Sequence, residues 1–379
     1  MAKAVNGANG TKEDDPPVLI VGAAGVSLGA RLRHMGIPAL LVDRHARVGN
    51  SWRNRYKSVM LNTPTFTDHY PFLEYPESWP RWLSRDAVAD FMEHYAQIVG
   101  LDVQTNTDGT SIERDEQRGS RVRSRNPTAH APFVRSMWFL PRESSTTSLS
   151  SPSSPARSSS RARSTTPAST HRPRWYPTFR TKKIVVIGPG TSGHDVAQDF
   201  DVTTIQRHPI FSLSAEAWET LQLGIWNKEG ITTEEADLVG NSIPLAVARS
   251  MSIGLTLAMA EFDKEMMVEG LRKAGLAGAS QIIIDGQIKI RRCEEGVKAF
   301  SEHGLTLADG THLKADIVVM ATGYKQNGLG DLGGKQERAG WWRPTGIPGL
   351  WYMTASFMWC RQFSQALALQ IAVAVKGSR

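Results

Sequence analysis

Lys182-Lys183-Ile184-Val185-Val186-Ile187-Gly188-Pro189-Gly190-Thr191-Ser192-Gly193-His194-Asp195 is the most informative segment of this chain for its fold. Four apolar residues lead into G-x-G-x-x-G and then into a helix, which is the context of a dinucleotide-binding turn. The glycines permit a tight turn and let backbone N–H groups approach a pyrophosphate at the helix N-terminus. We therefore predict a dinucleotide site with Gly188, Gly190, Ser192 and Gly193 as cofactor-binding residues.

A second, altered copy of this pattern stands near the N-terminus. Residues 18–32 read V-L-I-V-G-A-A-G-V-S-L-G-A-R-L, again an apolar strand, a turn with glycines and a helix. We assign Gly22 and Gly25 to this second turn. Two such units imply two nucleotides on one chain, and they predict an α/β fold with two Rossmann-like dinucleotide-binding domains.

Hydrophobic periodicity predicts the remaining elements. The helix 84–99 is amphipathic and has Ser84 as its N-cap. The helix 192–200 reaches the next strand with Asp201 alone between them, which is short for a parallel crossover. We expect strands at 18–21, 39–42, 202–205 and 317–320, helices at 25–36, 84–99 and 192–200, and hairpins, part of a β-meander, at 282–290 and 305–313 with Asp-Gly turns.

Composition limits the classes of protein. A chain of 379 residues with 40% hydrophobic content can hold two or three modules. Its two cysteines, without C-x-x-C, predict reduced thiols and a cytoplasmic protein.

The polar start, residues 1–17, predicts no signal peptide. The apolar stretch 243–260, interrupted by Arg249, predicts a buried or pocket-lining helix and no membrane span. The histidines have no metal-ligand spacing, so we expect no metal site.

One segment differs from the rest in charge and composition. Residues 114–183 carry fifteen Lys and Arg against three acids, a net charge of +12, so the other 309 residues carry −5. Residues 136–170 hold thirteen serines and five threonines and little that could form a core. We predict a disordered Ser/Arg-rich insert. Three interpretations remain open: a flexible linker, a basic nucleic-acid arm, or a stretch translated in the wrong frame.

The third interpretation has a specific observation behind it. The peptide 137–143, M-W-F-L-P-R-E, can be encoded as ATG TGG TTT TTG CCA CGG GAG. Read two bases on, the same letters give V-V-F-A-T-G. This hidden string resembles the in-frame I-V-V-M-A-T-G at 317–323. The coding DNA decides whether that reading exists.

The residues that follow the second strand of each unit indicate which nucleotide binds. Asp43 lies about twenty positions beyond Gly22 and suits a ribose 2′-hydroxyl, although a solvated turn residue is the alternative. The second unit has Gln206-Arg207-His208 there and no acid. Arg207 can pair with a 2′-phosphate, although a surface arginine is the alternative. The contrast predicts FAD in the first unit and NADPH in the second.

Taken with four further sets of residues, these features resemble the flavin-containing monooxygenases, in particular the indole-pyruvate-monooxygenase-like branch. The resemblance covers roughly residues 18–110 and 181–375. The matching stretches are the two nucleotide fingerprints, V-G-N-S-W-R at 48–53, L-N-T-P at 61–64 with F-L-E-Y-P at 72–76, A-T-G-Y at 321–324 and P-G-L-W-Y-M at 348–353.

The resemblance implies an activity. NADPH would reduce FAD, the flavin would trap O2 as a C4a-hydroperoxide, and a small organic substrate with an N, S or carbonyl group would be oxygenated. N,N-dimethylaniline monooxygenase activity is of this type. Such chemistry belongs to the cofactors, so no Ser-His-Asp set or metal cluster is needed.

The resemblance also assigns residues. Asn62 matches the position beside the flavin and is our candidate catalytic residue, with a turn-forming Asn-Thr-Pro as the alternative. Trp52 and Arg53 would lie near the flavin phosphates, or else be a buried Trp and a surface Arg. The further cofactor-binding residues are Gly49, Thr63, Ala321, Thr322 and Gly323.

The chain departs from the family at several motifs. The first fingerprint lacks two residues, including the middle glycine, and shortening this turn misplaces the N–H groups for a pyrophosphate. The family signature F-x-G-x-x-x-H is absent, and so is an in-frame first A-T-G strand. A rival hypothesis follows: the product of a decayed gene or of a wrong exon assignment, which keeps the fold but binds FAD poorly.

We expect a discontinuous FAD domain with the NADP domain inserted into it. The partners implied are a small organic substrate and O2, with no nucleic acid. The predicted units are a disordered N-terminus at 1–15, the FAD domain at 16–113, the Ser/Arg-rich segment at 114–180, the NADP domain at 181–314 and the return of the FAD domain at 315–379.

Overall fold

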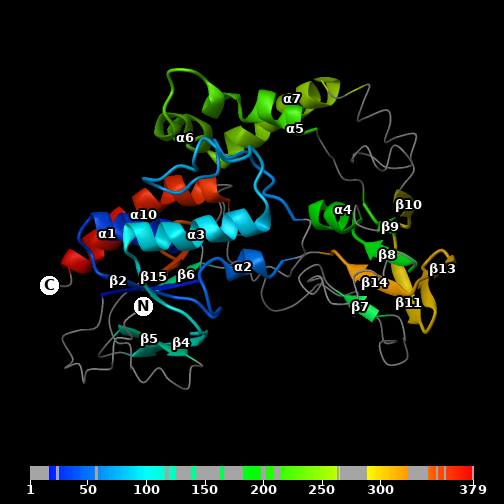
Figure 1. Cartoon of the computed structure of the whole chain (residues 1–379), viewed down its shortest axis with the longest axis horizontal. Helices are drawn as coiled ribbons and strands as arrows, with labels where there is room; N and C mark the ends of the chain where they lie inside the picture. Colours follow the sequence, from blue (N-terminus) through cyan, green and yellow to red (C-terminus); the bar gives the residue numbers. More distant parts are fainter. Residues whose placement is uncertain are drawn as a thin grey trace.

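The computed structural model describes residues 17–22, 25–55, 59–115, 119–124, 138–141, 163–165, 182–197, 202–208, 214–262, 264, 288–322, 340–346, 349–353 and 356–377. These residues form two five-stranded parallel sheets that lie toward opposite ends of the molecule (Figure 1). This arrangement agrees with the α/β class expected from the two fingerprints.

The first sheet has the strand order β15-β6-β1-β2-β3, and neighbouring strands are parallel. Figure 1 shows three helices on one side of it and a β-hairpin on the other. Its strands are β1 (Val18–Val21), β2 (Ala39–Val42), β3 (Asp102–Gln104), β6 (Trp138–Pro141) and β15 (Leu350–Met353). The helices are α1 (Val26–His34), α3 (Arg85–Val99) and α10 (Phe357–Gly377), and the hairpin is β4 (Gly109–Asp115) with β5 (Gly119–Ser124).

The second sheet has the order β10-β9-β8-β14-β7, and its strands are also parallel. Its strands are β7 (Arg163–Thr165), β8 (Ile184–Ile187), β9 (Val202–Gln206), β10 (Ile288–Arg292) and β14 (Ile317–Met320). β8 and β14 are buried at every position, as continuous apolar runs in parallel sheets are. An antiparallel sheet of β11 (Val297–Ser301), β12 (Gly304–Leu307) and β13 (His312–Lys314) shares its core.

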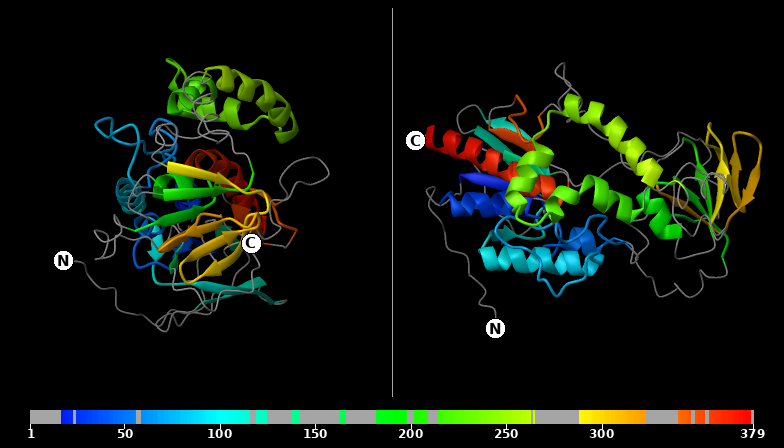
Figure 2. Two further views of the ribbon diagram at one scale, coloured as in Figure 1. Left: turned by 90° about the vertical axis from the view of Figure 1, so that its right-hand side faces the viewer. Right: turned by 90° about the horizontal axis from the view of Figure 1, so that it is seen from above.

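Helices follow two strands of the second sheet. α4 (Thr191–Ala197) follows β8, and a helical group follows β9. Seen from above in Figure 2, this group extends from α10 towards the second sheet. It consists of α5 (Ala215–Ala217), the single turns η4 (Trp218–Gln222) and η5 (Gly224–Asn227), α6 (Thr233–Asn241) and α7 (Leu245–Phe262).

Several predicted elements are confirmed. Ser84 caps α3, because its hydroxyl accepts the N–H of Ala87, and Gly100 ends the helix with a left-handed φ of 71°. The hairpin at 305–313 forms as β12 and β13 around the Asp309-Gly310 turn. The first strand of the hairpin at 282–290 lies outside the described residues, and Ile288–Arg292 pairs in parallel with β9.

Two expectations about the chain order need correction. Parts of the Ser/Arg-rich segment, expected to be disordered, are strands: β5 and β6 lie within it, and β7 joins the second sheet. β14 pairs with β8, so residues 317–320 belong to the second sheet. The return to the first sheet therefore comes after β14 and not at residue 315, and its first described strand is β15.

The apolar helix α7 is not buried as expected. Only Met259 among its described residues is buried, whereas Met251, Ile253 and Leu257 are all more than half exposed. The prediction holds for its first turn alone, where Leu245 and Ala248 line a cavity. Within the described part of the chain, α7 is one helix with the length and composition of a membrane span, a property that core helices of soluble proteins share.

Candidate dinucleotide sites

The second glycine-rich turn has the close packing that a dinucleotide turn requires. Gly188 has a φ of 106°, and a Cβ on it would lie 2.5 Å from the carbonyl oxygen of Ala321. A Cβ on Gly193 would lie 2.1 Å from the carbonyl oxygen of Gly188. No side chain fits at either position, so both glycines are required by the backbone geometry.

The outer part of this turn is open. Gly190 is exposed, and a Cβ on it would have no neighbouring atom within 4 Å. Thr191, the first residue of α4, is exposed as well, and Ser192 lies in the first turn of the same helix. The backbone N–H groups at the start of this helix therefore face a space that a phosphate could enter.

Arg207 lies at the end of β9, beside the same turn. It is exposed, and its side chain passes over the β10–β11 turn, where a Cβ on Gly296 would lie 2.9 Å from its Cδ. No carboxylate pairs with its guanidinium among the residues that the structure describes. The preceding residue, Gln206, is buried and donates its side-chain N–H to the carbonyl of His208 at 3.0 Å.

Ala321 and Thr322 belong to the second site. The N–H of Ala321 donates to the carbonyl of Ile187 at 2.8 Å, which places Ala321 at the end of β8 beside Gly188. These residues were expected to close on the flavin domain, and the geometry puts them at the second turn instead. Gly323 lies outside the described residues.

The first glycine-rich turn begins in the same way. The N–H of Gly22 donates to Val42 at 2.8 Å, and that of Gly188 donates to Ile205 at 3.0 Å, so each turn is anchored to the last apolar residue of the next strand. Asp43 and Gln206 follow these two anchors and are structurally equivalent. Arg207 therefore lies one residue beyond the acid position of the first unit.

The two turns differ where the helix starts. α4 begins two residues before Gly193, whereas α1 begins directly after Gly25. The N–H of Gly25 donates to the carbonyl of Gly22 at 3.0 Å, and residues 26–28 are fully buried. Ala23 and Ala24 lie outside the described residues. The described amides at the start of α1 are therefore closed to a pyrophosphate, in contrast to those of α4.

Asp43 is buried at the end of β2, so it is not a solvated turn residue. Its Oδ1 accepts the backbone N–H of His45 and lies 2.8 Å from the ring Nδ1 of the same residue. The backbone N–H of Asp43 donates to Gln104 at 3.0 Å, which fixes β2 against β3. One carboxylate oxygen thus already serves the local loop.

The loop at 48–53 is held against α3. Gly49, with a φ of 84°, precedes the short helix α2 (Asn50–Arg53), and a Cβ on it would lie 2.3 Å from the carbonyl oxygen of Ala89. Trp52 packs on the first core, with its ring 6.1 Å from that of Phe357 at the start of α10.

Arg53 is committed to the protein. Its Nη2 donates to Asp90 and Glu93, each at 2.7 Å, and its Nη1 donates to the carbonyl of Val48 and to Asn50. The salt bridges hold the pKa of Glu93 below its usual range, chiefly through its bond with Arg47. Arg53 therefore joins α2 to α3. Because both of its terminal nitrogens already have acceptors, its Nε–H is the donor that remains to bind a phosphate.

Asn62, the predicted catalytic residue, is exposed in the loop before Thr63. The Thr63 hydroxyl donates to Asp68, which is buried. Burial raises the pKa of the Asp68 carboxyl to about 6, against the opposing effects of the Thr63 hydrogen bond and of Arg361. Thr63 is thus hydrogen-bonded to a buried acid, Asp68, which no sequence motif indicates.

A buried ion pair lies beside this loop. Arg361 on α10 is completely buried and binds both carboxylate oxygens of Asp237 on α6, at 2.7 and 2.6 Å. Its Nη1 donates to the carbonyls of Thr67 and His69. The indole N–H of Trp226 donates to Asp237 at 2.9 Å. These residues are far apart in the sequence, so no local pattern could have indicated the cluster.

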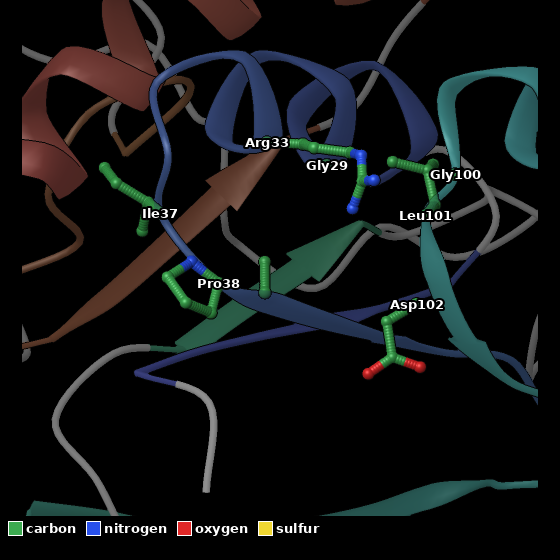
Figure 3. Close-up of a pocket in the computed structure, with 8 residues that line it drawn as sticks. Gly29, Arg33, Ile37, Pro38, Gly100, Leu101 and Asp102 are labelled. Carbon is green, nitrogen blue, oxygen red and sulfur yellow. The ribbon is translucent and has the colours of Figure 1, made fainter. Parts of the chain in front are cut away.

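A further cavity lies at the other end of the first sheet. It has a volume of about 170 Å³ and is bordered by the start of β2 and of β3 and by the Gly100 turn (Figure 3). Arg33 points towards Gly100 and Leu101, while the carboxylate of Asp102 points away (Figure 3). Because the strands are parallel, this cavity lies at the end opposite to Gly22, and it is not part of the dinucleotide site.

Within the described ranges, no group of three or more His, Cys, Asp or Glu side chains could hold a metal ion. Both cysteines, Cys293 and Cys360, are buried, and neither forms a disulfide. Burial raises the pKa of the Cys360 thiol to about 12, so this thiol is not a nucleophile at neutral pH.

The chain is similar in sequence to known monooxygenases. No family model matches the chain. An indole-3-pyruvate monooxygenase of Oryza sativa subsp. japonica, YUCCA4, is 24% identical over 345 residues, which cover 83% of this chain and 75% of the relative.

Two solved structures show the same fold. A flavin-containing monooxygenase from Stenotrophomonas maltophilia superimposes with a TM-score of 0.62 at 17% identity, over 96% of this chain and 99% of its own. An OTEMO complex with FAD and NADP superimposes with a TM-score of 0.64 at 13% identity, over 96% and 85%. The chain is therefore similar in sequence to indole-3-pyruvate monooxygenases and similar in fold to solved flavin-dependent monooxygenases.

Proposed function

We propose that this chain is an NADPH-dependent oxidoreductase of the flavin monooxygenase type, which uses FAD and O2 to oxygenate a small N-, S- or carbonyl-bearing organic substrate. The observation that carries the proposal is the second turn: an open G-x-G-x-x-G beside Arg207, which has no carboxylate partner among the described residues. The solved relative in complex with FAD and NADP supports the same pair of cofactors.

The second unit fits NADPH. Gly188 and Gly193 let the backbone turn closely, and the amides of Gly190 to Ser192 would hold the pyrophosphate. Arg207 would pair with the 2′-phosphate, because a guanidinium binds phosphate in a bidentate manner. Bound there, NADPH supplies a hydride. Ala321 and Thr322, beside Gly188, would border its path towards the first unit.

The first unit fits FAD less well. Asp43 has the position for a ribose contact, and Gly49 and Trp52 have the positions expected near the flavin phosphates. The described amides at the start of α1 are buried, however, and the guanidinium of Arg53 is bound to Asp90 and Glu93. The residues of this turn that the structure describes thus do not form an open pyrophosphate site.

This mismatch favours a second candidate: a family member that keeps the fold and the NADPH site but binds FAD poorly. The place of β6 is a further observation in its favour. β6 lies beside β1 as β14 lies beside β8, and the shifted-frame reading of residues 137–143 would supply there an A-T-G strand like that of β14.

The location we propose is the cytoplasm, because neither cysteine forms a disulfide. The exposed apolar face of α7 makes membrane association the alternative. Fractionation of cells that express the chain distinguishes the two, since a cytoplasmic protein stays in the supernatant without detergent.

Purification followed by absorption spectroscopy tests the proposed function. A yellow protein whose visible flavin band bleaches with NADPH, and which then consumes O2 with N,N-dimethylaniline, supports the monooxygenase. A colourless protein that ignores added FAD, yet binds NADPH in a fluorescence titration, supports the FAD-deficient member. Failure to bind NADPH overturns both.

A further inference from the structure

A second cavity lies away from the dinucleotide turns. It has a volume of about 340 Å³ and lies where the edge of the first sheet, α10 and the α6–α7 junction meet. Small-molecule sites typically occupy about 300–1,000 Å³. Four aromatic residues line one part of it: Trp341, Trp342, Trp359 and Phe363.

The aromatic wall is built on fixed backbone. The Trp342 N–H donates to Tyr352 of β15 at 2.9 Å, and the Gln370 amide donates to the Trp342 carbonyl at 3.2 Å. Edge-to-face ring contacts join Trp359 to Trp341 at 6.1 Å and to Phe363 at 5.6 Å. A wall held in this way is already formed before a ligand arrives, which lowers the entropy that binding loses.

The cavity is separate from the proposed cofactor sites. Phe357, at the start of α10, contacts Trp52 of the flavin-side loop. Arg361 faces the loop of Thr67, whereas Ala366 and Gln370 face the cavity. At about 100° per residue, Gln370 lies on the opposite side of α10 from Arg361. A ligand here would not contact the residues assigned to FAD or NADPH.

The polar side chains that line the cavity favour an anionic ligand over a cationic one. Arg343 is exposed at its rim and forms no ion pair with any carboxylate in the described part of the chain. The other polar side chains that line it, Asn241 and Gln370, are amides, and no acidic residue is among those described as lining it. Such a guanidinium beside aromatic rings matches a planar ring that carries a carboxylate.

We propose that this cavity is a binding site for a small aromatic carboxylate, held by the indole rings of Trp341 and Trp359 and by the guanidinium of Arg343. The site does not depend on the cofactor assignments. Its ring-sized volume, and one cation among the described residues that line it, favour a small molecule over a protein segment.

Isothermal titration calorimetry of the full chain with 2-naphthoate, without added cofactor, tests the proposal. 2-Naphthoate should bind, and the neutral 2-naphthalenemethanol should bind about tenfold more weakly, since a hydrogen bond to a charged group contributes at least that much. Arg343→Met should remove this difference. Ala366→Phe should reduce the binding of both compounds, because Ala366 lines the cavity.

Lys376→Met is the matched control. Lys376 is an exposed cation on the same helix and does not line the cavity, so this variant should bind 2-naphthoate like the parent chain. No binding of 2-naphthoate, equal binding of the acid and the alcohol, or an Arg343→Met variant that still distinguishes them overturns the proposal. Near-ultraviolet circular dichroism confirms that each variant is folded. A chain that light scattering shows to be a dimer and that does not bind 2-naphthoate also overturns it.

Discussion

At the scale of single residues, Gly296 determines where Arg207 can lie. Gly296 is in the left-handed region, with a φ of 80°, and the Arg207 side chain passes within contact distance of its missing Cβ. The N–H of Cys293, at the start of the same turn, donates to the carbonyl of Gln206 at 2.9 Å. The turn is therefore fixed to the end of β9, and together they position the guanidinium.

Gly296→Ala is expected to weaken NADPH binding about three- to tenfold and to leave NADH binding unchanged, because part of one charge-assisted hydrogen bond is lost. Fluorescence titration of both nucleotides measures this. Gly310→Ala is the matched control: Gly310 has a similar φ of 85° but no atom near its missing Cβ. If both variants lose NADPH affinity equally, backbone strain and not Arg207 is the cause.

Asp68 is a buried residue whose charge depends on pH. Its pKa is about 6 in the fold, raised by burial from its usual 3.8. The folded state therefore holds a proton that the unfolded state has lost, so the contribution of Asp68 to stability falls as pH rises from about 4 to 6 and is constant above. The shift of about 2 units corresponds to roughly 3 kcal/mol.

Asp68→Asn should accordingly stabilise the chain more at pH 7 than at pH 4, with the neutral amide still accepting from Thr63. The thermal midpoints of both proteins, measured from pH 4 to 7.5, give the difference. Burial and Arg361 lower the pKa of His69, so its contribution to stability is lost as pH falls, which is the opposite sense to Asp68. His69 is present in both proteins. A difference that does not change with pH would contradict a raised Asp68 pKa.

At the scale of elements, one ion pair joins α10 to α6. Arg361 belongs to the helix that packs on α1, and Asp237 belongs to the helical group between β9 and β10. Both side chains are almost completely buried, so neither charge can be hydrated if its partner is lost. The pair therefore fixes the helical group on the first unit, together with the carbonyls of Thr67 and His69.

Asp237→Asn should destabilise the chain by about 3–5 kcal/mol, since it leaves the Arg361 charge buried without a counter-ion. The double variant Asp237→Leu with Arg361→Met removes both charges and should recover part of the loss. Thermal denaturation of the three proteins measures this. A double variant that is less stable than Asp237→Asn would show that the carbonyl contacts of Arg361, and not the charge, dominate.

At the scale of the whole molecule, the first and second units repeat one plan but differ in where the helix after the glycine-rich turn begins. Each has the anchored first glycine and the same strand order around it, but α1 starts after Gly25, whereas α4 starts before Gly193. The proposed hydride transfer needs a nucleotide in each unit, so the proposed activity depends on whether FAD binds at the Gly22–Gly25 turn.

Insertion of Gly-Ser between Ala23 and Ala24 restores G-A-G-x-x-G and is expected to increase FAD affinity about tenfold or more, since the phosphate-facing amides become available. FAD fluorescence quenching measures this, and NADPH titration of the same protein checks that the second unit is unchanged. The same insertion in the Asp309-Gly310 turn is the control. Unchanged FAD affinity would locate the defect elsewhere, for instance at Arg53.

Sequence patterns predicted the elements better than their surroundings. Ser84 and the Asp309-Gly310 turn act through neighbours in the chain, so α3 and the β12–β13 hairpin were predictable. The apolar pattern of α7 does not indicate which part of the protein covers this helix, and most of its described residues are not buried. The apolar run at 317–320 likewise predicts a strand without saying which sheet it joins.

The candidate sites divide in the same way. The glycines at 188 and 193 act through local backbone geometry, and the structure gives them the expected close contacts. The partners of Arg53 lie 37 and 40 residues away, and those of Arg361 lie 124 residues away or more, so folding alone brings them together. Asn62 as a catalytic residue remains a prediction.

The last helix gives the C-terminus an unusual importance. α10 supplies Leu367 and Ile371 to the core of the first unit and Arg361 to the helices of the second. A nonsense codon near position 355, or a protease cut there, would release both halves of the protein at once. Truncation screens and affinity tags should therefore leave residues 357–377 intact.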